Sequence, residues 1–239
     1  QYRPLIASNY TSDSKFAVGV FSSGGISSNM SRTSVSNGLT SVGIGGTDWK
    51  SEPMLGIFLF NEGKEISTDI KHRQPIRAGV SFTYKLTDKF GLGTGISYTN
   101  LTSDIRSGSD SHYFSGEQVL HYVGVPVNVS YDIFRWKRMQ LYTSAGLLAE
   151  KCVKGKTSTD YVLNYNTAQT KTEDIDKKPF QFSLNATVGI QFTITNLIGV
   201  YAEPGVSYYF NDGTDIKTIY KDKPLNLNLN FGLRFTIGK

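Results

Sequence analysis

A strict alternation of apolar and small or polar residues closes this chain, in the segment LNLNLNFGLRF at 225–235. The odd positions carry only Leu or Phe, whereas the even positions carry Asn, Gly or Arg. Successive side chains of a β-strand point to opposite faces, so this period of two predicts a strand with one entirely apolar face. Such a face must be covered by a protein core or by the hydrocarbon of a lipid bilayer.

The same alternation recurs along the chain, for example in FQFSLNATVGIQFTI at 180–194 and in IRAGVSFTYKL at 76–86. No segment shows a convincing helical period, and no linker divides the chain into separate domains. We therefore expect one all-β domain. Its eight strands are expected at 15–21, 76–86, 90–99, 121–133, 139–150, 180–194, 198–210 and 225–235.

The links between these strands alternate between short and long. In an up-and-down barrel, this order places every long link at one end and every short turn, with both termini, at the other. Outer-membrane barrels have this asymmetry. We therefore predict an eight-stranded antiparallel up-and-down transmembrane β-barrel at 15–239, with long extracellular loops and short periplasmic turns, after an N-terminal periplasmic segment at 1–14. The expected long loops are 22–75, 100–120, 151–179 and 211–224, and the short turns are 87–89, 134–138 and 195–196.

A soluble lipocalin-like barrel is the alternative, because it also has eight alternating strands but turns its apolar face inward around a ligand. The polar faces of the expected strands argue against this arrangement. They carry mostly Gly, Ser, Thr, Asn and Gln, whereas a water-exposed surface normally carries many Lys and Glu. Glycine also suits the crowded and strongly bent interior of a narrow barrel. The composition therefore favours lipid outside the barrel.

Five charged residues share the inward-facing parity of the expected strands: Arg77, Lys85, Glu150, Glu203 and Arg234. A buried charge is costly unless it is paired, so we predict that these residues form one interior ion-pair network. An eight-stranded barrel is normally filled by side chains, which makes this network a plug of the lumen. The alternative is a gate that opens a small pore when the charges exchange partners.

Aromatic residues gather towards both ends of the expected strands. We predict two aromatic girdles, one at each membrane interface. The group near the short turns contains Tyr84, Phe90, Tyr131, Trp136, Phe192 and Phe235. The group near the long loops contains Tyr98, Phe182, Tyr208 and Phe210.

Composition limits the remaining possibilities. Cys152 is the only cysteine, which excludes an internal disulfide. The longest apolar run, MLGIFLF at 54–60, falls far short of the roughly 20 residues of a membrane-spanning helix. The net charge of +5 is compatible with attraction to anionic lipid head groups. We predict a monomer in contact with outer-membrane lipid, with no cofactor and no nucleic acid as a partner.

Some eight-stranded outer-membrane barrels modify lipid A, and the deacylase type needs a His and a Ser close together on the outer wall. His72 and His112 fall in or beside the long loops, and His121 faces outward between Val119 and Val123, without a Ser neighbour. The sequence groups no residues that predict a metal site. We therefore predict no catalytic residues, no metal site and no enzyme activity; a lipid A-modifying enzyme is a further alternative.

The expected loops are rich in basic residues. We predict that these loops carry the function, in a structural, adhesive, lipopolysaccharide-binding or partner-binding role; the alternative is that their charges are merely solvated. The basic loop residues are Lys71, Arg73, Lys154, Lys156, Lys171, Lys177, Lys178, Lys217, Lys221 and Lys223.

Two stretches of the chain resemble a known family. They are IKHRQPIRAGVSFTYKLTDKFGLGTGISYTNLTSD at 70–104 and LHYVGVPVNVSYDIFRWKRMQLYTSAGLLAEKCVKG at 120–155. They resemble the outer-membrane β-barrel domain family common in Bacteroides-type bacteria, which is similar to the transmembrane domain of outer-membrane protein A. The resemblance implies an eight-stranded barrel in the cell outer membrane, and it implies no agreed biochemical activity.

Overall fold

The computed structural model describes residues 15–25, 29–36, 57, 59–61 and 65–237 of the chain. The predicted N-terminal periplasmic segment at 1–14 lies outside these residues. Within the described part, no helix has the length and apolar character needed to cross a bilayer.

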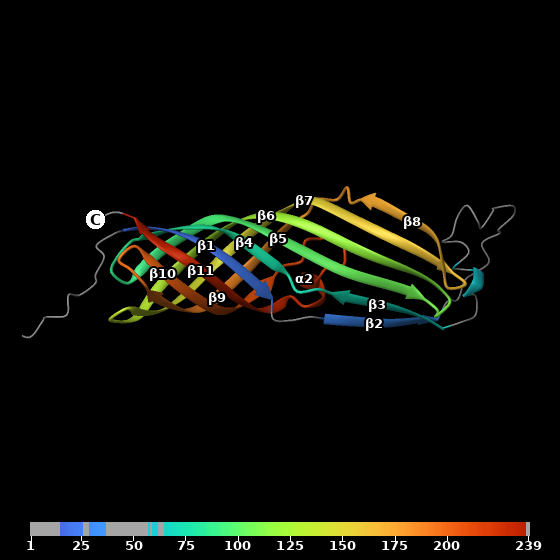
Figure 1. Cartoon of the computed structure of the whole chain (residues 1–239), viewed down its shortest axis with the longest axis horizontal. Helices are drawn as coiled ribbons and strands as arrows, with labels where there is room; N and C mark the ends of the chain where they lie inside the picture. The colour runs from blue at the N-terminus through green and yellow to red at the C-terminus, as the bar shows by residue number, and fades with distance from the viewer. Residues whose placement is uncertain (1–14, 26–28, 37–56, 58, 62–64, 238–239) are drawn as a thin grey trace, which may run out of the picture.

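Eight strands form a closed antiparallel ring (Figure 1). They are β1 (Phe16–Gly25), β4 (Ile76–Lys85), β5 (Phe90–Gly108), β6 (His112–Trp136), β7 (Met139–Leu163), β9 (Phe180–Thr193), β10 (Ile198–Tyr209) and β11 (Leu225–Ile237). Each pairs with the next in this order, and β11 pairs with β1, from Phe16 opposite Ile237 to Gly25 opposite Asn228. A closed ring leaves no strand edge whose backbone groups would lack partners in lipid. All eight strands expected from the alternation are present.

The outer and inner faces of the ring differ as the alternation requires. Bulky apolar side chains such as Val127 on β6, Val188 on β9 and Leu227 on β11 point outward and are exposed. Small and polar side chains such as Ser97 and Thr187 point inward and are buried. The ring therefore has an apolar wall outside and a polar interior.

Three further strands and a short helix lie where long loops were expected. They are β2 (Asn29–Ser36), β3 (Glu65–His72), β8 (Asn166–Asp174) and α2 (Ile219–Asp222). The expectation that the chain has no helix is wrong for α2, whose four residues are too few to show a period. The extra strands form because β5 and β7 continue past the ring and offer unpaired backbone groups. β3 pairs with β5, β2 pairs with β3, and β8 pairs with β7.

The continuations of β5, β6 and β7 build a curved sheet at the end of the ring opposite the short turns (Figure 1). Its strand order is β2, β3, β5, β6, β7, β8. We call it the distal sheet; it comprises β2, β3, β8 and residues 101–108, 112–120 and 153–163. β6 and β7 are each 25 residues long, whereas about 10 residues of a tilted strand cross a bilayer. The distal sheet therefore projects well beyond the apolar wall.

Candidate functional site

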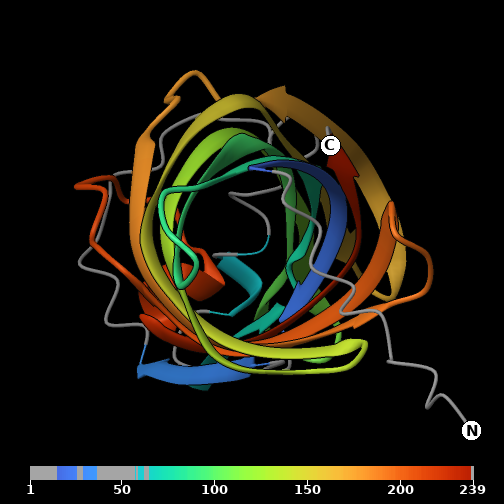
Figure 2. The same ribbon diagram turned by 90° about the vertical axis from the view of Figure 1, so that its left-hand side faces the viewer.

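The link at 211–224, which we call the plug loop, folds into the distal end of the ring. Figure 2 views the barrel along its axis and shows α2 inside the circle of strands. Tyr220 of α2 is only 2% exposed and stacks on Tyr209 of β10. The buried apolar cluster around the loop contains Leu101, Leu120, Tyr122, Cys152, Tyr209, Ile219 and Tyr220.

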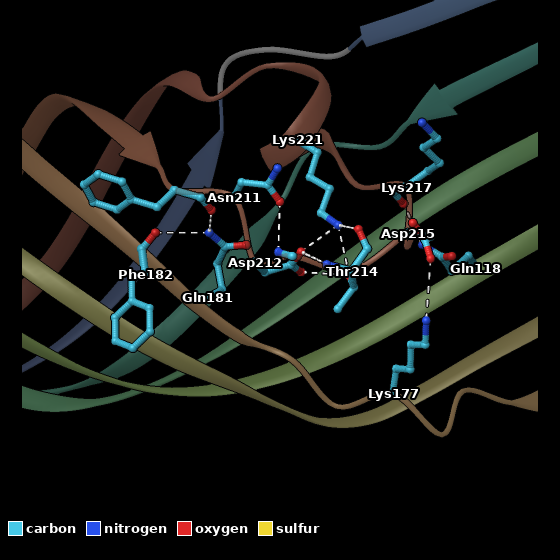
Figure 3. Close-up of polar contacts among 12 residues, drawn as sticks. Gln118, Lys177, Gln181, Phe182, Asn211, Asp212, Thr214, Asp215, Lys217 and Lys221 are labelled. Carbon is cyan, nitrogen blue, oxygen red and sulfur yellow. Dashed lines mark hydrogen bonds and ion pairs between the residues drawn. The ribbon is translucent and has the colours of Figure 1, made fainter.

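Polar contacts also hold the plug loop in place (Figure 3). Within the loop, Lys221 Nζ lies 2.6 Å from a carboxylate oxygen of Asp212, whose side chain is buried. From the wall, Gln118 of β6 donates a hydrogen bond through Nε2 to the carbonyl oxygen of Lys217, at 2.8 Å. The loop is therefore fixed by its own ion pair and by a contact with the barrel wall.

A chain of Ser, His and Asp side chains connects β5, β3 and the plug loop. His72 Nδ1 lies 2.7 Å from Ser103 Oγ, and His72 Nε2 lies 2.9 Å from Asp222 Oδ2. These are the residue types of a hydrolase triad. However, Ser103 is only 2% exposed, and it lies directly opposite His72 in the pairing of β3 with β5. Its hydroxyl is therefore closed to substrate. The contacts of His72 with Ser103 and Asp222 instead tie the plug loop to the wall.

A first charge cluster in the lumen lies beside the plug loop. Arg77 Nη2 lies 3.2 Å from Oε2 of Glu150, which is 1% exposed. The hydroxyl of Thr99 donates to Oε1 of the same carboxylate at 2.6 Å. Arg77 also donates to the phenolic oxygen of Tyr209 at 3.1 Å. The buried carboxylate is therefore compensated by an opposite charge and a second donor, as a stable buried ion pair requires.

A second charge cluster lies nearer the short turns. Arg234 Nη1 donates to Oε1 of Gln191 at 2.6 Å, and Arg234 Nη2 lies 3.8 Å from Oε1 of Glu203. The hydroxyl of Tyr142 donates to the same oxygen of Glu203. The guanidinium of Arg234 lies 5.3 Å from the ring centroid of Tyr142 and 4.9 Å from that of Tyr201. Tyr142 therefore contacts both charges of this cluster.

Two glycines make room for these tyrosines. A methyl group added at Gly189 would lie 2.3 Å from the ring of Tyr142. One added at Gly232 would lie 2.5 Å from the ring of Tyr201. Both distances are far below van der Waals contact, so glycine at these inward positions allows large aromatic rings to fill the barrel.

A cavity of about 130 Å³ inside the ring is lined by residues of both clusters, among them Arg77, Glu203 and Arg234. A smaller cavity of about 60 Å³ lies towards the short turns and is lined by Lys85. Tyr142 and Arg234 line both cavities and separate them. Four of the five predicted charges thus lie in two clusters, Arg77 with Glu150 and Arg234 with Glu203. Lys85 joins neither cluster, and no described carboxylate lies within ion-pair distance of it.

The predicted girdle residues lie outside the ring, near its two ends. Near the short turns, Phe90 contacts Tyr131, with ring centroids 5.0 Å apart. Near the distal end, Tyr208 contacts Phe210 edge-on, with centroids 5.4 Å apart. The position of both groups at the membrane interfaces stays a prediction. The exposed members are Tyr84, Phe90, Trp136, Phe192 and Phe235 at one end and Tyr98, Phe182, Tyr208 and Phe210 at the other.

The other two histidines have aromatic neighbours. His121 Nδ1 lies 2.5 Å from the hydroxyl oxygen of Tyr98 on the outer wall. His112 stacks on Phe60, with ring centroids 4.6 Å apart. Across the described ranges, no group of three His, Cys, Asp or Glu side chains is placed to hold a metal ion.

The basic residues of the expected loops differ in their surroundings. Arg73 Nη2 lies 2.8 Å from Asp104 and 3.0 Å from Glu117, and the hydrogen bonds and charge of Asp104, with those of Glu117, raise the pKa of Arg73. Lys154 and Lys156, in contrast, are exposed. No described carboxylate lies within ion-pair distance of either ammonium group. Part of the basic surface is therefore already neutralised, and part is free to bind an anion.

A closed antiparallel ring with an apolar outer wall and a polar interior defines the class of transmembrane β-barrels. The family model described as outer membrane protein beta-barrel domain matches residues 7–238. The chain therefore belongs to this family, and it lies in the cell outer membrane.

The chain is also similar to several solved outer-membrane structures. No curated protein matches it. Neisserial surface protein A shares 14% identity with a TM-score of 0.41, covering 93% of this chain and 97% of that one. OprG from Pseudomonas aeruginosa shares 9% identity with a TM-score of 0.40, covering 95% and 97%. Ail of Yersinia pestis shares 9% identity with a TM-score of 0.39, covering 93% and 97%.

Family membership confirms the predicted fold class and the location, and it excludes the soluble lipocalin-like alternative. Lipid surrounds the apolar wall. That the distal sheet faces the cell exterior stays a prediction. The restriction to Bacteroides-type bacteria stays a prediction.

Sequence reasoning missed several residues of the lumen. Tyr142 shares the inward parity of Glu150 on the same strand, so the alternation contained the signal that could have found it. Tyr220 and Asp222 carried no such signal, because α2 is a single turn inside a polar link. Their roles follow from where the plug loop folds.

Proposed function

We propose that this protein is a non-enzymatic outer-membrane barrel with a closed lumen, which displays the distal sheet outside the cell to bind a surface partner or lipopolysaccharide. The observation that carries this proposal is the length of β6 and β7, at 25 residues each against 10 for β4. Spanning the membrane does not require the additional residues. Residues 112–120 of β6 alone extend for about 30 Å along the strand.

Contacts inside the ring support a closed lumen, and with it a role in display instead of transport. The plug loop fills the distal end, the Arg77–Glu150 pair lies beside it, and Arg234 with Tyr142 separates the two cavities. Solutes would have to displace both charge clusters to cross the barrel. Opening would leave buried charges without partners, which is costly. A gate that opens a pore is therefore the less favoured role.

The distal sheet has the character of a binding surface. Its strands carry polar and charged side chains, and Arg106 lies over the ring of Tyr113, 4.0 Å from its centroid. In the described part of the sheet, β8 pairs only with β7 and leaves one edge free. Lys171 and Glu173 on β8 form an ion pair, at 2.7 Å. Charged side chains on an edge strand hinder self-association, so the edge stays available to another partner.

The β7–β8 hairpin offers a direct test. Ser158 lies opposite Thr172, so residues 159–171 can be replaced by Asn-Gly, which favours a tight hairpin turn. Full-length protein and this shortened variant would be measured against immobilised lipopolysaccharide and immobilised sulfated and neutral polysaccharides. We expect the full-length protein to bind one of these surfaces and the shortened variant to lose that binding.

The same two proteins would be inserted in planar lipid bilayers. We expect neither to show stepwise ion conductance, because the shortened hairpin leaves both charge clusters intact. Equal binding by the two proteins would contradict the role of the hairpin. Stepwise conductance by the full-length protein would contradict the closed lumen.

A further inference from the structure

A β-bulge interrupts β7 just above the apolar wall. Tyr122 of β6 lies opposite Cys152, whereas the preceding residue, His121, lies opposite Lys154. Val153 is therefore an extra residue on β7. A bulge of this kind reverses the alternation of side chains beyond it.

The reversal gathers three lysines on one face. Lys151 points outward before the bulge, so strict alternation would turn Lys154 and Lys156 inward. With the bulge, Lys151, Lys154 and Lys156 are all exposed, whereas Cys152 and Gly155 are buried. The inward position of Gly155 is fixed by packing, because an added methyl group there would lie 2.9 Å from the side chain of Leu120. The lysine row thus follows from the backbone.

The row begins at the apolar wall. Lys151 lies opposite Val123 on β6 and opposite Phe180 on β9, and both are exposed. Lys151 Nζ lies 4.8 Å from the ring centroid of Phe180. Lys154 and Lys156 follow at two-residue spacings along the ladder, each about 7 Å farther along the strand. The row therefore crosses the level at which apolar wall gives way to the distal sheet.

The charges of the row are uncompensated within the described residues. No carboxylate there lies within ion-pair distance of Lys151, Lys154 or Lys156. Asp174 lies opposite Lys156 in the pairing of β7 with β8, without forming an ion pair with it. By contrast, Arg73 in the link between β3 and β4 is paired with two carboxylates. Three neighbouring cations without a carboxylate partner repel one another, and a bound anion relieves this repulsion.

We propose that Lys151, Lys154 and Lys156 form a binding site for the phosphate groups of anionic lipids in the outer leaflet. Lysine is a compact cation on a flexible stem, which suits phosphate binding at an interface. The exposed Val123 and Phe180 beside the row provide an apolar surface for the acyl chains. A lipid is the favoured occupant, and not a soluble polyanion, because the row starts on that apolar surface. The site rests on the lipid-binding part of the proposed function and needs no partner on the β7–β8 hairpin.

The test uses the full chain folded in neutral detergent micelles. Native mass spectrometry would count bound lipid during titration with diphosphorylated lipid A, with its dephosphorylated form and with phosphatidylcholine. In the test variant, Lys151, Lys154 and Lys156 are replaced by Gln. We expect its affinity for the diphosphorylated lipid to fall about tenfold or more, and its weak binding of the other two lipids to be unchanged.

A matched control removes the same charge from the other end of the barrel, with Lys15, Lys89 and Lys137 replaced by Gln. We expect it to bind like the original chain. Equal loss in both variants, or no loss in the test variant, would overturn the proposal. Competition by inorganic phosphate or heparin that equals competition by lipid would also overturn it, because the site would then take a soluble anion. The hairpin-shortened protein keeps all three lysines, so it should retain lipid A even if its binding to immobilised surfaces is lost.

Discussion

Tyr220 of the plug loop lies flat against Tyr209 of β10, with ring centroids 3.5 Å apart and ring planes inclined by 8°. Tyr209 in turn accepts a hydrogen bond from Arg77, which is paired with Glu150. The stack therefore joins the apolar packing of the plug loop to the first charge cluster. The plug loop and the distal wall of the barrel therefore pack as one unit.

Tyr220→Ala should release the plug loop, because it removes a buried ring from the apolar cluster. We expect the free energy of unfolding to fall by about 3 to 5 kcal/mol, as for other buried aromatic truncations. Trypsin should then cleave after Lys217 or Lys221 in the folded protein. Limited proteolysis followed by mass spectrometry measures this. Tyr165→Ala is the control, since Tyr165 is 77% exposed, and equal cleavage of both variants would contradict the packing role of Tyr220.

The two charge clusters should differ in coupling energy. Arg77 and Glu150 are 3.2 Å apart, whereas Arg234 and Glu203 are 3.8 Å apart and are bridged by Tyr142. Double-mutant cycles with Gln at each position would measure both couplings from urea unfolding in micelles. Each single change at the first pair should cost about 3 to 5 kcal/mol, because it leaves a buried charge alone. We expect the larger coupling for Arg77 and Glu150, and the reverse order would contradict the assigned geometry.

Val188→Arg tests the contact of the apolar wall with lipid. Val188 is 50% exposed on the apolar outer wall, on β9. We expect a loss of about 2 to 4 kcal/mol in folding free energy, the cost of Arg near the bilayer midplane. Urea titration in lipid vesicles measures it. Gln169→Arg, on the exposed edge strand β8, should cost far less, and equal costs would place Val188 outside the hydrocarbon.

Ser103 should be unreactive despite its contact with His72. Its hydroxyl is closed to substrate, so a fluorescent fluorophosphonate should not label the folded protein. Gel fluorescence compares the original chain with Ser103→Ala. Labelling that disappears in this variant would show that the Ser–His–Asp chain is an accessible catalytic site, and the non-enzymatic proposal would fail.

The two-residue alternation of apolar and polar residues predicted most of the fold. An outward apolar side chain at every second position is readable without coordinates, because the side chains of a strand alternate whatever its neighbours are. Arg77, Glu150, Glu203 and Arg234 were assigned to the lumen by the same parity. The pairing of Arg77 with Glu150 could not be read in this way, because heights along a tilted barrel depend on the register between strands.

The sequence by itself determined eight membrane strands, their apolar outer faces and the alternation of short and long links. The tertiary structure decided what the long links do: β3 and β8 pair with the free edges of β5 and β7, and α2 enters the lumen. It also decided that Lys151, Lys154 and Lys156 share one face, since one extra residue in β7 reverses the alternation. The physical reason is that a two-residue period is a property of one strand, whereas pairing, bulges and plugging depend on contacts between segments far apart in the chain.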